Sequence, residues 1–394
     1  MVRQSLARKL GSIWSTQHWN FEYKGVLTNH LAHGVVALEH LGAPDARIED
    51  FVAKYEASTP LRDASEARQE EDALGLPPLE EFDSDLVGAR KRFFALRDFY
   101  QREVDRKGRD VVIRAYLNRL LPGICGALLH NMIHLGYGYR AQVDQTTVEG
   151  LAYMHHSYLP LARPQSQHNA NSAKADDMHA VSYQEFEAAF LRACDRMRSE
   201  DTIPQLLKQR AHEADDFSNS RPQNQLRIIS LYAIDDLHEL SKDLPLVPSI
   251  AWYVDLLCRV FVDTTREQAQ DKKSGKAVYS FILLHGVTCS WALHQVEHLV
   301  DPAFAQQCLA NTLLAVMAVC GVPQLPSSSC PHEAEARNKS WENLLPALRE
   351  KDLDEHAYKL GAVAYERALS CDANCSPALY KQATQIVTNL RSSL

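Results

Sequence analysis

Apolar residues recur every three to four positions along most of this chain, which is the spacing that places them on one face of an α-helix. Short connections containing Gly, Pro or clustered polar residues separate these stretches. The pattern predicts helices over His30–Leu41, Ile48–Tyr55, Leu86–Val104, Asp110–Tyr116, Tyr183–Met197, Pro204–Ala211, Asn224–Leu240, Ile250–Ala269, Trp341–Leu348, Leu353–Ser370 and Ser376–Ser392. Since no useful length of chain alternates apolar and polar residues, as a strand would, we predict an all-α fold.

Two further segments are apolar on most of their faces and are expected at the centre of the fold. They are Val278–Leu299 and Asp301–Val322. Pro122 is expected to begin another helix, which continues through Leu129 towards Gly136. The polar stretches 63–85, 164–180 and 323–338 indicate connections, and none is long enough to force separate domains. We therefore predict a single large multi-helix domain over residues 1–394.

Composition and charge narrow the possible partners. The chain carries 42 Lys and Arg against 50 Asp and Glu, a formal charge of -8, which makes a phosphate backbone a poor partner. The longest apolar run, near Leu313–Val319, is far shorter than the roughly 20 residues of a spanning helix, and no secretory signal is seen. We expect no nucleic acid, no membrane and a cytoplasmic protein whose nine cysteines are reduced.

Histidine is the residue type that points to chemistry. Neutral imidazole is the commonest metal ligand among side chains, and residues three or four apart share a helix face. Seventeen histidines are present, and several lie close together: His30 and His33, His130 and His134, His155 and His156, and His285, His294 and His298, with His356 further on. The alternative for any one of them is a hydrogen-bonded core residue, which would leave a non-catalytic helical scaffold.

The usual nucleotide-binding fingerprints are missing. Gly136-Tyr137-Gly138 lacks the third glycine and follows a predicted helix instead of a strand, and neither a P-loop nor a G-x-S-x-G elbow occurs. A flavin enzyme using NADPH would need a dinucleotide-binding βαβ unit, so the sequence argues against a conventional flavin monooxygenase.

One local motif suggests a different enzyme class. His294-Gln295-Val296-Glu297-His298 matches H-x-x-E-H, in which two histidines on a helix bind zinc and the glutamate acts as a general base. Only three positions are fixed, so a histidine-rich helical protein can match by chance. A zinc-dependent hydrolase using residues 294–298 stays open as an alternative.

Four segments in order resemble the questin oxidase-like family, and they extend over nearly the whole chain. They are Thr28–Gly34 (TNHLAHG) with Ala37–Leu38 and Leu41–Ala43, His130–Gly138 (HNMIHLGYG) with Glu149–Ala152, Leu284–Thr288 (LHGVT), and Asp354–Lys359 (DEHAYK). The family includes fungal enzymes that open the central ring of anthraquinones and bacterial members of unknown substrate. It was first described as Baeyer–Villiger oxidases using NADPH, and one branch is understood as non-heme iron dioxygenases.

The resemblance implies a metal site. In the iron branch, four histidines and a lysine carboxylated on its side-chain nitrogen bind Fe(II). Carried over by motif, the ligands are His30, His130, His285, His356 and Lys359, with His33 and His134 expected behind them. It further implies an oxygenase that acts with O2 on an aromatic or quinone-type, polyketide-like small molecule. The chain is shorter than expected of the fungal enzymes and its segment Gln165–Lys174 is unusually polar, which leaves a substrate other than an anthraquinone open.

The ligand set is chemically coherent. Four neutral imidazoles leave the charge of the cation uncompensated, and a lysine carbamate formed with CO2 would add an anionic oxygen donor. His356 and Lys359 are three apart and share a helix face. Two alternatives stay open: Lys359 is a surface lysine that pairs with Glu355, or Glu355 is itself the anionic ligand. Asp354 is expected to begin the helix.

Further side chains near the expected ligands are candidates for supporting roles. Asn29 and Thr288 would orient the imidazoles, and an apolar pocket would be lined by Tyr137, Tyr139, Tyr153 and Trp291. The sequence leaves open the exact substrate, the choice between mono- and dioxygenase chemistry, the need for NADPH and the oligomeric state.

Overall fold

The computed structural model describes residues 18–164, 181–216, 220–270, 278–323, 340–370, 372–389 and 391–392. The polar segment Gln165–Lys174 and most of the connection 323–338 lie outside these residues. The first helices of the described residues are α2 (Leu31–His40), α3 (Asp45–Ser58), α4 (Ala64–Asp72), α5 (Phe93–Lys107), α6 (Arg109–Leu120), α7 (His130–Ala141) and α8 (Asp144–His156).

The rest of the described chain is helical as well. Its helices are α9 (Tyr183–Glu200), α10 (Thr202–Gln209), α11 (Ala211–Asp216), α12 (Arg221–Tyr232), α13 (Ile234–Ser241), α14 (Ala251–Gln270), α15 (Phe281–Val296), α16 (Pro302–Val319), α18 (Trp341–Glu350), α19 (Glu355–Leu369) and α20 (Pro377–Asn389). Three 3₁₀ turns lie at Ser84–Leu86, Leu121–Gly123 and Glu297–Leu299.

Strands within the described residues are limited to two short pairs. Strands β1 (Glu22–Tyr23) and β2 (Leu27–Thr28) form an antiparallel pair directly before α2. Strands β3 (Val278–Tyr279) and β4 (Arg391–Ser392) pair in parallel, which joins the end of the chain to the start of α15. The predicted all-α, multi-helix fold is confirmed.

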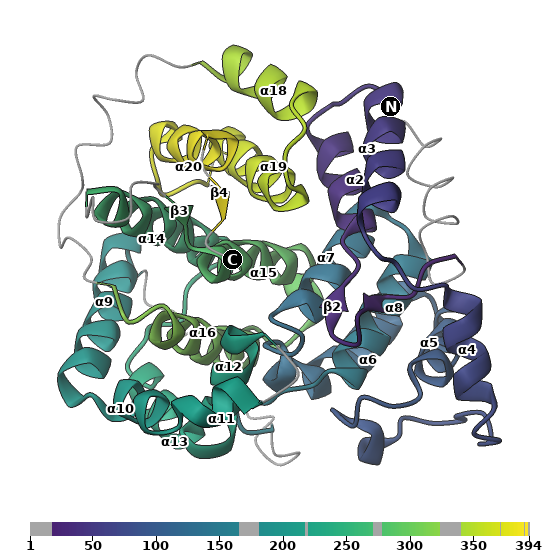
Figure 1. Ribbon diagram of the computed structural model, residues 1–394. Helices are drawn as coiled ribbons and strands as arrows, with labels where there is room; N and C mark the ends of the chain where they lie inside the picture. Colours follow the sequence, from purple (N-terminus) through teal and green to yellow (C-terminus); the bar gives the residue numbers. More distant parts are fainter. Residues whose placement is uncertain are drawn as a thin grey trace.

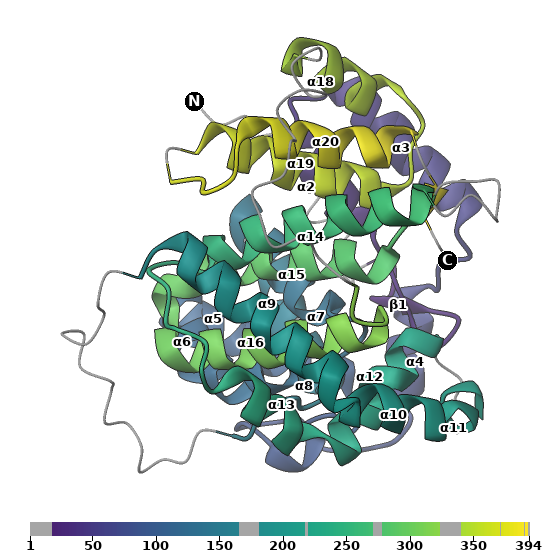
Figure 2. The ribbon, with the colours of Figure 1, turned by 90° about the vertical axis from the view of Figure 1, so that its left-hand side faces the viewer.

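Helix α15 runs through the middle of the molecule (Figures 1 and 2). Its buried apolar side chains and those of the helices around it form one continuous core. It packs against α7, α14, α16 and α19, and α19 also packs against α2 and α20. Because α15 is buried on nearly every face, its sequence is apolar almost throughout, as the pattern over 278–299 indicated. The core places the first turns of α2, α7 and α19 near the first half of α15.

Several predicted boundaries were wrong for local reasons. The stretch 63–85 contains α4, which Asp63 caps by accepting hydrogen bonds from the backbone N–H groups of Ser65 and Glu66. The helix expected over Asn224–Leu240 is interrupted at Ala233, which lies between α12 and α13. Helix α8 was not among the predicted helices. Turn and cap conformations, which periodicity does not report, decide these cases.

The helix expected from Pro122 through Leu129 is also wrong. Pro122 begins only a single 3₁₀ turn, and Ala127, Leu128 and Leu129 have φ angles of 51°, 54° and 69°. Residues in this left-handed region end a right-handed helix, so α7 begins afresh at His130. The sequence carries no glycine at these three positions to announce the break.

Among the described residues, α16 is the one helix long and apolar enough to cross a membrane by length and composition. Its mean hydropathy is 1.3, and 72% of it is buried inside the fold. The helix packs against α12, α13 and α15. Burial in a protein core accounts for the same composition.

Candidate metal centre

Four histidines that lie in or directly before four different helices meet at one buried point. His30 directly precedes α2, His130 is the first residue of α7, His285 lies in the second turn of α15, and His356 is the second residue of α19. One ring nitrogen from each lies within 4.8 Å of those of the others, and all four side chains are buried. The Nε2 atom of His130 is 2.6 Å from that of His30 and 2.8 Å from that of His285.

The other ring nitrogen of each imidazole faces an acceptor. His130 Nδ1 donates to the carbonyl oxygen of Ala127 over 2.7 Å, and His285 Nδ1 donates to that of Phe281 over 2.7 Å. His356 Nδ1 lies 2.6 Å from the Asp354 carboxylate. A carbonyl oxygen or an ionised carboxylate can only accept, so the neutral rings of His130, His285 and His356 carry their protons on Nδ1 and their lone pairs on Nε2.

This proton placement leaves lone pairs facing each other at hydrogen-bonding distance. A direct bond between His130 Nε2 and His285 Nε2 would need one doubly protonated ring. Burial, with neighbouring positive charge, holds the pKa of both histidines well below its usual value and opposes that state. In addition, His356 Nε2 is buried and has no hydrogen-bond partner. A bound metal cation would satisfy all these nitrogens at once, so the residues present fit a metal ion.

Lys359 is the unusual cation beside this cluster. Its side chain is fully buried, and Nζ has no hydrogen-bond partner. Desolvation lowers the pKa of Lys359 to about 8, although Glu355 and Asp354 oppose the shift. Its charge acts on His30, His130 and His285. The structure thus places Lys359 in the interior with the four histidines, and the surface interpretation of this lysine is wrong.

The two acidic residues of the fourth motif lie on the outer side of the imidazoles. Asp354 caps α19 by accepting from the backbone N–H of His356, in addition to its bond with the ring. Glu355 Oε1 is 3.4 Å from Nδ1 of both His30 and His356. Since these are the outward nitrogens, Glu355 supports the rings from behind, in a position different from that of the inward Nε2 atoms.

His33 and His134 form a second buried pair next to the cluster. His33 Nε2 lies 3.0 Å from His134 Nδ1, and His134 Nε2 lies 3.3 Å from the Glu149 carboxylate. The rings of His33 and His30 have centroids 5.5 Å apart. The pair therefore lies next to the four converging imidazoles.

Other expected supporting residues have different roles. Asn29 accepts from the backbone N–H of Leu31 at the start of α2, and Thr288 donates to backbone carbonyls of its own helix. Neither polar group contacts an imidazole nitrogen of the cluster in these bonds. Asn29 therefore stabilises the start of α2, next to His30, whereas the Thr288 hydroxyl is satisfied within α15.

The four aromatic residues expected to line a pocket are mostly engaged elsewhere. Tyr153 donates to Glu22, Trp291 donates to Glu366, and Tyr139 lies 3.1 Å from His298. Tyr137 packs beside His33 and has no hydrogen-bond partner for its buried hydroxyl. The sequence missed Phe281, whose ring centroid is 4.3 Å from that of His285 and 4.6 Å from that of His356. Its spacing of four from His285 on one helix face was the available signal.

The H-x-x-E-H motif does not form one face of a helix. Helix α15 ends at Val296, and His298 lies in the following 3₁₀ turn. Glu297 accepts from Ser249 and from the backbone N–H of Ile250, and it also contacts His294. The motif therefore ties the end of α15 to the start of α14, and in the described structure it contributes to no cluster of three metal-binding side chains.

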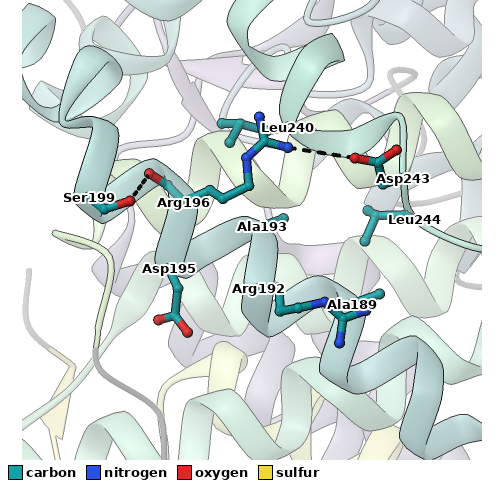
Figure 3. Close-up of a pocket in the computed structure, with 9 residues that line it drawn as sticks. All are labelled: Ala189, Arg192, Ala193, Asp195, Arg196, Ser199, Leu240, Asp243 and Leu244. Carbon is teal, nitrogen blue, oxygen red and sulfur yellow. Dashed lines mark hydrogen bonds and ion pairs between the residues drawn. The ribbon is translucent and has the colours of Figure 1, made fainter.

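A separate groove of about 430 Å³ lies between α9 and α13 (Figure 3). It is lined by small apolar residues together with Arg192, Arg196, Asp195 and Asp243. Its elements carry none of the converging histidines. Charged side chains of both signs make this groove unlike the apolar pocket expected beside the metal.

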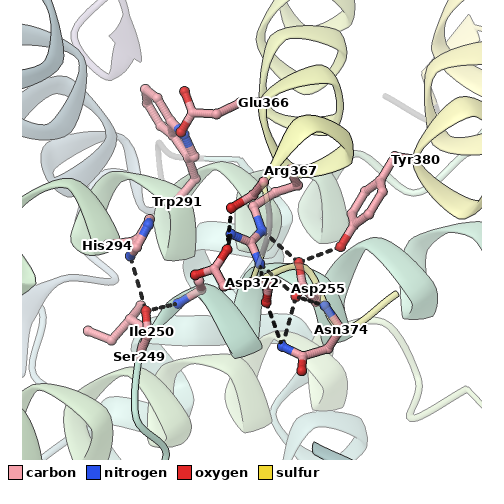
Figure 4. A network of polar contacts seen from close by, with 12 residues as sticks. Ser249, Ile250, Asp255, Trp291, His294, Glu366, Arg367, Asp372, Asn374 and Tyr380 are labelled. Carbon is pink, nitrogen blue, oxygen red and sulfur yellow. Dashed lines mark hydrogen bonds and ion pairs between the residues drawn. The ribbon is translucent and has the colours of Figure 1, made fainter. Parts of the chain in front are cut away.

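A buried ion pair fixes helix α19, which carries both His356 and Lys359. Arg367 donates to both carboxylate oxygens of Asp255 in α14, over 2.8 and 2.9 Å. Tyr380 of α20 and Asn374 donate to the same carboxylate (Figure 4). The pair is bidentate, and both carboxylate oxygens of Asp255 accept hydrogen bonds. It therefore holds α14, α19 and α20 in fixed positions relative to one another.

Comparison with known proteins assigns the chain to a family. The sequence pattern described as questin oxidase-like matches residues 27–362 and so includes all four histidines and Lys359. The chain belongs to the questin oxidase-like family. Membership in this family implies an oxidoreductase. A comparison with curated proteins found no match.

Because the histidines are buried, we expect this protein without its metal to lose stability in acid. The pKa values of His30, His130 and His285 in the folded chain lie well below 6.5, first because of desolvation. Below pH 6.5 the unfolded chain therefore binds protons that the folded chain cannot, and stability falls as the pH falls. Each such histidine contributes a slope of up to about 1.4 kcal/mol per pH unit.

Guanidinium unfolding of chelator-treated protein between pH 7.5 and 5 measures this effect. The free energy of unfolding should fall steeply over this range, and His285→Leu should reduce the slope because one protonatable group is removed. Equal slopes in the two proteins would contradict the prediction.

Proposed function

We propose that this protein is a non-heme iron-dependent oxygenase that uses O2 to oxidise an aromatic or quinone-type substrate. The observation that carries the proposal is the set of Nε2 lone pairs from His30, His130, His285 and His356, which converge in a buried site. Imidazole suits iron, zinc and copper alike, and family membership is what favours iron. Bound there, Fe(II) would allow O2 to react with a closed-shell organic molecule in one-electron steps, while the net electrons come from the substrate or from an external donor.

Lys359 would complete the site as a carbamate. A protonated lysine has no lone pair, whereas a deprotonated Nζ can form a bond to the carbon of CO2 and release one proton. The product is an anion that can bind a metal through an oxygen atom, as a carboxylate does. Support comes from the burial of Lys359, from its unpartnered Nζ and from the lowered pKa of its amine.

The surrounding residues orient the imidazoles and exclude water. Acceptors behind each ring fix the tautomer and the ring plane, which usually contributes about 10–100-fold to metal affinity. Phe281 packs against two of the rings and removes water from one side of the site. An apolar aromatic substrate would be stabilised by contact with such a surface.

We further propose that the reaction is either oxidative C–C cleavage or a Baeyer–Villiger-type insertion beside a carbonyl. Family membership supports an anthraquinone-like, polyketide-like molecule as the substrate class. The two reactions differ in their electron balance. A dioxygenase places both oxygen atoms in the product, whereas a monooxygenase reduces one of them to water with two electrons from a donor such as NADPH.

Oxygen uptake by iron-loaded protein tests the proposal. Protein without a histidine tag is reconstituted with Fe(II) without air, and then mixed with O2 and a panel of anthraquinones, anthraquinols and aromatic ketones, with and without NADPH. Substrate-dependent O2 consumption is expected, and the NADPH consumed per O2 separates the two reactions. Iron-loaded protein that consumes no O2 with any compound beyond the rate of metal-free protein would contradict the proposal.

Loss of the lysine amine should weaken the metal site. We expect Lys359→Met to lower iron affinity by at least about tenfold, because an anionic ligand is lost and four neutral imidazoles remain. In ¹³C-bicarbonate buffer, the wild-type protein with metal should show a carbamate carbon signal that Lys359→Met lacks. Lys54→Met is the matched control, because Lys54 is an exposed lysine paired with Asp352 and Asp50. Equal affinity and equal spectra in both variants would show that Lys359 is not a ligand.

A further inference from the structure

Three consecutive non-glycine residues in the left-handed region directly precede His130. The φ angles of Ala127, Leu128 and Leu129 are 51°, 54° and 69°. L-residues avoid this region because Cβ approaches the following carbonyl oxygen, and they adopt it as isolated residues, not in runs. A run of three therefore needs contacts that hold it, and such strain is found mostly at functional sites.

The turn determines where the first residue of α7 points. The Ala127 carbonyl accepts from the backbone N–H of His130 over 3.2 Å and from its Nδ1 over 2.7 Å. If Ala127 returned to a right-handed conformation, this carbonyl would move, and the His130 ring would lose the acceptor that fixes its tautomer. The Nε2 atom of His130, which lies between those of His30 and His285, depends on that ring orientation.

One side chain from a distant helix holds the turn at its middle residue. The Oε1 atom of Gln223, in α12, accepts from the backbone N–H of Leu128. Leu128 is buried, so this N–H would otherwise be an unpaired buried donor. On the other side, Gly126 fits closely against Ser157, because a Cβ atom there would lie 2.0 Å from the Ser157 carbonyl oxygen. Neither contact touches an imidazole.

We infer that Gln223 is a positioning residue for the metal centre, acting through the left-handed turn 127–129 and the Ala127 carbonyl on His130. The inference rests on the proposed metal centre. It gives α12, which carries none of the four histidines, a role in setting metal affinity. The residues that determine this affinity thus extend beyond those that contact the metal.

Titration with Co(II) alone tests the role of Gln223, because imidazole-bound Co(II) has visible absorption bands that report the ligand set. We expect Gln223→Ala to bind Co(II) about 10–100-fold more weakly and with altered bands, as loss of a partner behind a ligand does. Gln223→Glu keeps an acceptor oxygen and should retain most of the affinity. Ala127→Gly in the Gln223→Ala background should recover part of it, because glycine adopts the left-handed region without steric cost.

Gln306→Ala is the matched control. Gln306 Oε1 accepts from the backbone N–H of Val247 in the same manner, on a helix that carries none of the converging histidines. Its loss should lower the Tm of the metal-free protein at least as much as Gln223→Ala does, without changing Co(II) affinity or spectrum. Affinity falling equally in both glutamine variants, or in neither, would overturn the inference.

The outcome is separable from the proposed oxygenase activity. A wild-type protein that binds Co(II) but consumes no O2 with Fe(II) would refute the oxygenase proposal, while the Gln223 comparison would still decide the inference. A wild-type protein that binds no Co(II) would overturn both.

Discussion

His285→Ala is expected to abolish metal binding. His285 lies in the central helix α15, and its Nε2 atom is 2.8 Å from that of His130. The substitution removes one metal ligand, and the neighbouring apolar side chains offer no replacement. Loss of a residue behind a ligand alone costs about 10–100-fold in affinity, so loss of a ligand should cost about 100-fold or more. Metal analysis by mass spectrometry after reconstitution with Fe(II) measures this.

The matched control is His155→Ala. His155 is equally buried, but it contacts Tyr100 and the Asp83 carbonyl and lies outside the cluster. Both variants remove a buried imidazole and should lower stability, yet only His285→Ala should lose the metal. Near-stoichiometric iron in His285→Ala would contradict the assignment. Zinc retained in that variant would instead support a zinc site at His294 and His298, although Glu297 is already bonded to Ser249 and Ile250.

Arg367→Met is expected to destabilise the fold by roughly 3–5 kcal/mol, the usual cost of leaving one member of a buried ion pair without its partner. Asp255 is fully buried, and Arg367 is 2% exposed. Without the guanidinium, the carboxylate keeps only the bonds from Tyr380 and Asn374, and its charge is uncompensated. Urea unfolding of the metal-free protein measures the change in free energy.

Two further variants separate charge burial from loss of packing. The double variant Asp255→Asn/Arg367→Met removes both charges and should recover much of the lost stability. Arg196→Met removes an arginine from an exposed pair with Glu200 and should change stability by no more than about 0.5 kcal/mol. If the double variant were as unstable as Arg367→Met, the loss would come from packing of the methylene stem and not from the unpaired charge.

The Asp255–Arg367 pair also supports the metal centre, because it fixes the helix that carries two of the proposed ligands. It fixes the C-terminal half of α19, and the N-terminal turn of the same helix carries His356 and Lys359. Helix α19 is anchored at its other end by Asp354, which caps it and contacts the His356 ring. A metal site built on a helix held at both ends keeps its ligands in place before the metal binds, which lowers the ordering cost of binding.

Much of the secondary structure was predictable because a helix with one buried face shows a regular spacing of apolar residues along the sequence. The apolar spacing in segments such as Ile48–Tyr55 and Tyr183–Met197 placed α3 and α9 correctly, since each helix buries one face. Family membership was predictable as well, because the four motifs are short, ordered and distributed along the chain. The apolar spacing of a helix and each single family motif are both contained in a short stretch of neighbouring residues.

The failures share a cause in backbone conformation. The sequence around Pro122 and Leu129 is apolar at helical spacing, yet the chain turns left-handed over three residues without a glycine. Local propensity opposes this conformation, and contacts from Gln223 in α12 and from the Ser157 region override it. A conformation stabilised by residues about 30 to 95 positions away cannot be seen in the local pattern.

The sequence by itself determined that the chain is helical, that it belongs to a family of oxidoreductases, and which histidines are candidates for a metal site. Only the tertiary structure decided that His30, His130, His285 and His356 meet, that their lone pairs face inward, and that Lys359 is buried without a partner. It also showed that His294 and His298 do not share one helix face, because the helix ends between them. The physical reason is that helical spacing fixes which residues share a face, whereas convergence of four helices depends on how their faces pack.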